Sequence, residues 1–102
     1  MKEIKLLVEH IEEELEDACT YAELALEYKD TNQEMAQLFW KLSNEEMGHQ
    51  QLLHGQVTQL IAEHRRTHGE PPASMMAVYE FMHKRFVEKA EKVLNLQNMF
   101  RK

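Results

Sequence analysis

Two glutamates and a histidine interrupt helical stripes that are otherwise apolar. Glu14 falls in the series of residues 7, 11, 14, 18, 21 and 25, and Glu46 and His49 fall in the series 35, 39, 42, 46, 49 and 53. Burying a carboxylate without a partner is energetically costly, so inward-facing acids need an explanation. Carboxylate oxygens combined with an imidazole nitrogen suit iron, manganese or zinc. The pattern therefore indicates a metal site.

The spacing of Glu46 and His49 supports this interpretation. Residues three apart project from the same helix face, and Glu-x-x-His is the arrangement that di-iron carboxylate bundles use. The motif alone is weakly specific, because a chain with 18 acidic residues and 6 histidines also contains Glu80–His83. The alternative is that Glu14 and Glu46 lie at the stripe edges and reach water.

The heights of the three residues along the predicted helices strengthen the case for a site. The first turn is expected near residues 30–32, about 16 residues from both Glu14 and Glu46, at a rise of about 1.5 Å per residue. In an antiparallel pair, Glu14 should therefore face Glu46 and His49.

The same arithmetic excludes Glu80–His83 from this site. It places His83 level with about residue 59, roughly 20 Å from Glu46. We expect His83 to be a packed or surface residue, near Glu63.

Three helices must position these residues, over residues 2–29, 33–68 and 73–101 of a single domain, 1–102. The chain has only 3 Gly and 2 Pro, and its abundant Glu, Leu, Ala, Gln and Lys favour helix. Thr31 and Glu34 have the form of a capping box, and Gly69 followed by Pro71 marks a helix end. The expected fold is all-α, a long antiparallel hairpin plus a third helix.

Apolar residues at helical spacing predict which faces are buried. In the second helix they are Met35, Phe39, Leu42, Leu53, Val57 and Leu60, with Leu38 and Ile61 beside them. Gly48 and Gly55 are seven residues apart and share a face, which suggests either a close approach by a neighbouring helix or a tolerated weak point. Cys19, the single cysteine, is expected to pack without a disulfide.

Composition excludes several functional classes. A net charge of −6 argues against binding nucleic acid or an anionic membrane. No apolar run approaches the roughly 20 residues that span a bilayer, and the N-terminus lacks signal-peptide features. We expect a cytoplasmic protein, and its small size favours oligomerisation.

Glu14, Tyr21, Glu46 and His49 together resemble the ferritin-like superfamily. Ferritin-like and rubrerythrin-like proteins carry a ligand Glu, a Tyr seven residues later, and Glu-x-x-His on the next helix. The resemblance covers about residues 10–55. It implies a di-iron carboxylate site, with Glu14, Glu46 and His49 as catalytic metal ligands and Tyr21 as a hydrogen-bond donor beside them; an ordinary core tyrosine is the alternative.

The chain supplies only half of a ferritin-like ligand set. Two copies would provide four carboxylates and two imidazoles, as in encapsulated ferritins, which are similar half-size proteins. The resemblance therefore implies a homodimer or higher even-numbered oligomer with a four-helix-bundle core and two iron ions per dimer, acting as a ferroxidase-type oxidoreductase. Manganese or zinc could replace iron. The alternatives are a peroxide-scavenging di-metal protein and a non-enzymatic helical interaction module. The C-terminal sequence NMFRK lacks a typical encapsulin-targeting tail.

Overall fold

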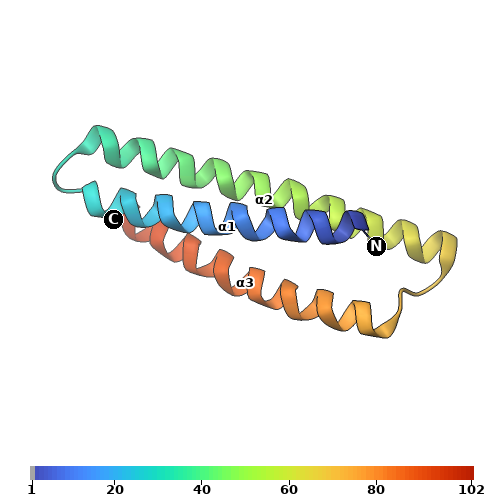
Figure 1. Cartoon of the computed structure of the whole chain (residues 1–102). Helices are drawn as coiled ribbons and strands as arrows, with labels where there is room; N and C mark the ends of the chain where they lie inside the picture. The colour runs from blue at the N-terminus through green and yellow to red at the C-terminus, as the bar shows by residue number, and fades with distance from the viewer. Residues whose placement is uncertain (1) are drawn as a thin grey trace.

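The computed structural model describes residues 2–102, and these form three α-helices (Figure 1). They are α1 (Lys2–Tyr28), α2 (Gln33–His68) and α3 (Ala73–Arg101). The all-α class and the three predicted segments are confirmed, with α1 ending one residue earlier than expected. None of these helices has a segment that is both long and apolar enough to cross a membrane.

The turn between α1 and α2 is capped by a different residue from the one predicted. Asn32, not Thr31, is the N-cap of α2, and its side-chain oxygen accepts a hydrogen bond from the Met35 backbone N–H at 3.1 Å. The capping-box interpretation was therefore wrong by one residue. Asparagine and threonine are both good N-caps, so their order in the sequence could not decide between them.

Gly69 ends α2, as predicted. Its φ of 82° is a left-handed conformation that favours glycine, and its N–H donates to the Arg65 carbonyl at 3.2 Å. Pro71 and Pro72 follow, and α3 begins at the next residue, Ala73. The chain thus turns over a short segment and starts back along the molecule.

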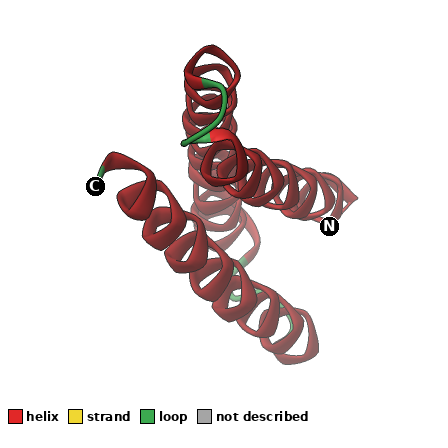
Figure 2. Ribbon diagram, turned by 90° about the vertical axis from the view of Figure 1, so that its left-hand side faces the viewer, coloured by secondary structure: helices red, strands yellow, loops and turns green. Residues whose placement is uncertain are grey.

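The helices form a hairpin with a third helix laid against one side. α1 packs along both α2 and α3, whereas α2 and α3 touch each other little. Figures 1 and 2 show α3 inclined to the other two helices, and its C-terminal end approaches α1. The molecule is a rod with extents of 55 × 18 × 18 Å, and its length matches the roughly 54 Å expected of a 36-residue helix.

The core follows the inward stripe of α1 and the facing stripes of α2 and α3. Its most buried side chains include Ile11, Leu15, Ala18, Val57 and Val93. Leu38 departs from the prediction: it is 50% exposed. Ala36 and Ser43, which the apolar pattern did not identify, are fully buried on α2 instead.

A hydrogen-bonded chain through the core joins all three helices. The Ser43 hydroxyl on α2 donates to the Ala18 carbonyl of α1 at 2.7 Å. It accepts from the Gln97 side-chain amide of α3 at 2.9 Å. Both polar side chains are buried, so the Gln97 amide depends on the Ser43 hydroxyl for its partner.

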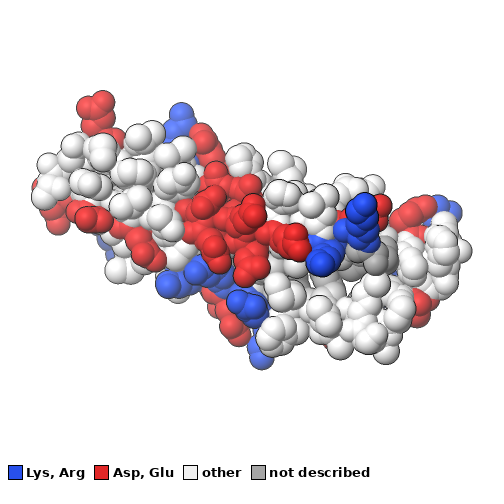
Figure 3. All heavy atoms as spheres, in the orientation of Figure 1, with Lys and Arg blue, Asp and Glu red and all other residues white. Residues whose placement is uncertain are grey.

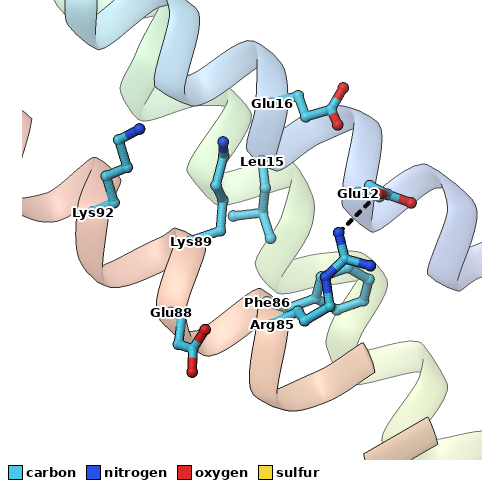
Figure 4. A pocket seen from close by; sticks show the side chains of 8 residues that line it. All are labelled: Glu12, Leu15, Glu16, Arg85, Phe86, Glu88, Lys89 and Lys92. Carbon is cyan, nitrogen blue, oxygen red and sulfur yellow. Dashed lines mark ion pairs between the residues drawn. The ribbon is translucent and has the colours of Figure 1, made fainter. Parts of the chain in front are cut away.

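Charges of opposite sign line the two sides of the α1–α3 contact. Figure 4 shows Lys89 and Lys92 extending from α3 toward α1, with Leu15 and Phe86 between the helices. Arg85 forms an ion pair with Glu12 at 3.9 Å, drawn as a dashed line in the figure. This arrangement adds electrostatic attraction to the apolar contact that holds α3.

The glycines of α2 lie against open space. A β-carbon at Gly48 or Gly55 would meet no atom within 4 Å in the described chain. The suggested close approach of a neighbouring helix therefore does not occur within one copy.

Candidate metal centre

The facing stripes of α1 and α2 bring Glu14, Glu46 and His49 together. One ligand atom from each lies within 4.8 Å of the other two. The His49 Nδ1 atom is 3.5 Å from Glu14 Oε2 and 3.8 Å from Glu46 Oε2. The predicted juxtaposition is thus present in the structure, because an antiparallel hairpin turning at residues 29–32 sets these residues at one height.

The three side chains differ in their exposure to solvent. The Glu14 and Glu46 side chains are 25% and 19% exposed, whereas that of His49 is 55% exposed. The carboxylates are therefore partly withdrawn from water, and the cluster is open on the histidine side. Both glutamates keep some contact with solvent, as the alternative interpretation expected, but most of each side chain is buried.

One carboxylate oxygen in the cluster accepts no hydrogen bond although it is buried. Glu14 Oε2 is inaccessible to solvent, and the His49 Nδ1 atom 3.5 Å away is near it without hydrogen-bonding to it. An orphaned buried carboxylate oxygen is costly, and a cation compensates it directly. This oxygen, the second carboxylate and the imidazole form a donor set that fits a divalent transition metal.

Acidic side chains surround this region of the surface. Six acids occur between Glu9 and Asp17, and Figure 3 shows acidic side chains gathered over the middle of α1. Their field attracts cations toward the helix that carries Glu14.

Tyr21 lies two turns beyond Glu14 on α1, and its described contact is aromatic. Its ring stacks on Phe39 of α2, with centroids 6.1 Å apart and planes at 16°. This contact accounts for the tyrosine as a packing residue. The hydrogen-bonding role implied by the resemblance stays a prediction.

His83 lies away from this cluster, but its neighbour is not the one predicted. Its Nδ1 atom is 3.2 Å from His54 Nε2 on α2, and Glu63 instead pairs with Arg66. The expectation that His83 lies near Glu63 was wrong because it assumed a strictly antiparallel α3. Sequence spacing carries no signal for the inclination of a helix.

Cys19 is buried, as predicted, and has no disulfide. Burial raises the pKa of its thiol, and the hydrogen bond from Sγ to Glu23 Oε1 at 3.2 Å raises that pKa further. The thiolate is therefore disfavoured, and the buried side chain packs in the core.

Comparison with known protein families, curated proteins and solved structures finds no match to this chain.

Proposed function

We propose that the protein binds a pair of iron ions at a site shared between two copies. The observation that carries the proposal is the cluster of Glu14, Glu46 and His49, whose ligand atoms lie within 4.8 Å of one another. The orphaned Glu14 oxygen adds support, since a buried carboxylate oxygen calls for a cation.

The donor count argues for two copies. One chain supplies two carboxylates and one imidazole, which is half the set found in ferritin-like di-iron bundles. The exposed side chain of His49 leaves the cluster open, so a second copy can approach there. Two-fold symmetry would then complete a ferritin-like four-helix core around four carboxylates and two imidazoles.

The proposed activity is oxidation of Fe²⁺ by O₂ or peroxide in the cytoplasm, with Fe²⁺ as substrate. Glu14 and Glu46 would hold the ions through oxygen, and one of them could bridge the pair. His49 would supply a terminal nitrogen. Tyr21 would orient a ligand carboxylate if its hydroxyl turned toward the site. Manganese or zinc suits the same donors.

Neighbouring glutamates provide matched controls for the ligand test. We expect Glu14→Gln and Glu46→Gln to abolish stoichiometric Fe²⁺ binding in an anaerobic titration, because each removes a charged oxygen donor. Glu13→Gln and Glu45→Gln remove the same charge one residue away, at exposed positions outside the cluster, and should leave binding intact. Similar affinity in all four variants would overturn the proposal.

A second candidate function is a non-enzymatic interaction module with the same helical fold. The exposed leucines and the open face at Gly48 and Gly55 favour a surface that packs on another helix. Measuring Fe²⁺ binding and oxidation distinguishes this interaction module from the proposed iron site. The module would bind no iron stoichiometrically and would not accelerate Fe²⁺ oxidation. Faster consumption of peroxide than of O₂ would indicate the peroxide-scavenging alternative.

A further inference from the structure

A second pair of metal-ligating side chains lies outside the acidic cluster, where α2 and α3 meet; its member on α2, His54, is five residues beyond His49. The His54 Nε2 and His83 Nδ1 atoms are 3.2 Å apart. Their rings stack with centroids 5.0 Å apart and planes at 26°. The pair is notable because it joins the two helices that otherwise touch little.

An aromatic neighbour packs against one of the two rings. Tyr79, one turn before His83 on α3, stacks on the His83 ring with centroids 5.9 Å apart. Both histidines are half-buried. The contact with Tyr79 restrains the His83 ring, so less conformational freedom is lost when that ring binds a ligand.

The distance between the nitrogens fits a tetrahedral metal ion. At the Zn–N bond length of about 2.1 Å, nitrogens separated by 3.2 Å subtend an angle of about 100°. That angle is near the tetrahedral value. To bind one ion, both rings must turn from this arrangement so that the ion lies in the plane of each ring and replaces the hydrogen bond between the two nitrogens.

The protonation state of His54 also suits a metal. Burial lowers the pKa of His54, and the neighbouring His83 lowers it further. A neutral imidazole is the form that coordinates metal.

We propose that His54 and His83 form a second metal site, specific for Zn²⁺ or another divalent ion that prefers imidazole nitrogen, and that the bound ion clamps α3 to α2. The site differs from the acidic cluster in its donors, since it offers two nitrogens and no carboxylate. Imidazole donors suit zinc and copper, whereas oxygen-rich sites suit harder ions. The proposal does not depend on the function of Glu14, Glu46 and His49.

The test is a Zn²⁺ titration of ¹⁵N-labelled full-length protein carrying Glu14→Gln, Glu46→Gln and His49→Gln. Two-dimensional spectra of the histidine ring nitrogens report coordination at each ring. We expect His54 Nε2 and His83 Nδ1 to shift together at one equivalent of Zn²⁺ and to return when a chelator is added. Adding His54→Gln should abolish the shift at His83, and adding His83→Gln should abolish that at His54.

The pair of half-buried His64 and exposed His68 provides the control. These rings also stack, with centroids 5.1 Å apart, but both lie on α2 and cannot clamp it to α3. Adding His64→Gln should leave the response of His54 and His83 unchanged. Zn²⁺ should raise the melting temperature of the His64 variant but not of the His54 variant. Shifts confined to His64 and His68, or equal stabilisation of both variants, would overturn the proposal.

Discussion

Ser43 shows how a single polar residue can hold three helices in register. Its hydroxyl donates to α1 and accepts from Gln97 of α3, and both side chains are buried. Replacing Ser43 with alanine removes two hydrogen bonds and leaves the Gln97 amide without its partner. A buried donor without a partner lowers the free energy of unfolding, because its lost hydration is not compensated.

We therefore expect Ser43→Ala to lower the free energy of unfolding by about 1–3 kcal/mol. Urea denaturation of the metal-free protein measures this loss. Ser74→Ala, at an exposed position near the start of α3, is the control and should change stability little. An equally small effect at Ser43 would show that the network contributes nothing net.

His54 should make stability depend on pH. Its pKa in the folded protein is lowered by burial and by His83, so the folded state binds protons less readily than the unfolded state. The stabilising contribution of neutral His54 is complete above the unfolded pKa of about 6.5 and declines as pH falls through the folded pKa.

The melting temperature of metal-free protein should accordingly fall between pH 7.5 and pH 5, and by less in His54→Gln. Removing the histidine eliminates the contribution of His54 to the difference in proton binding between the folded and unfolded states. His10→Gln, at an exposed position of α1, should keep the wild-type slope. Parallel curves for wild type and His54→Gln would contradict the assignment.

At the residue scale, the sequence predicted Glu14, Glu46 and His49 because a short turn fixes heights along two long helices. It gave no comparable signal for Ser43 or Gln97, since a polar residue in a stripe looks the same whether it reaches water or a buried partner. The partner of His83 could not be predicted either, because it depends on how α3 crosses α2 rather than on the spacing of residues in the sequence.

The helix boundaries show which local signals are decisive. Gly69 and the two prolines after it predicted the end of α2 and the start of α3. Glycine readily adopts the positive φ found at helix ends, and proline cannot continue a helix. The first residue of α2 could not be predicted in the same way, because Thr31 and Asn32 are both suitable N-cap residues. The inclination of α3 has no signature in the sequence.

Substitutions at the first turn would test the cap directly. We expect Asn32→Ala to destabilise the protein by about 1 kcal/mol, because the Met35 N–H loses its acceptor. Thr31→Ala is the matched control and should have little effect, since Thr31 lies in the turn before the cap. Chemical denaturation measures the free energy of unfolding of both variants. A larger loss of stability in Thr31→Ala than in Asn32→Ala would support Thr31 as the N-cap.

Over the whole molecule, the proposed shared site predicts assembly through the face that bears His49. Leu38 lies eleven residues, about three helical turns, before His49 on α2, so the two share a face. A leucine that is 50% exposed there is explained if a second copy covers it.

Sedimentation equilibrium should therefore show a dimer at micromolar concentration. Leu38→Lys should shift the protein toward monomer by placing a charge in the apolar contact, and it should weaken iron binding in parallel. Asn95→Lys introduces the same charge at an exposed polar position on α3 and should leave the dimer intact. A stable wild-type monomer that binds a full complement of iron would refute the shared site.

The rod shape also determines how the protein rotates in solution. Backbone N–H bonds in a helix lie nearly parallel to its axis, and α1 and α2 run along the 55 Å dimension. Their reorientation therefore reports end-over-end tumbling, which is slower than rotation about the long axis. The transverse relaxation rates of helical amide nitrogens should therefore exceed those of a sphere of equal mass. Side-by-side pairing of two rods would reduce that anisotropy while lengthening the overall correlation time.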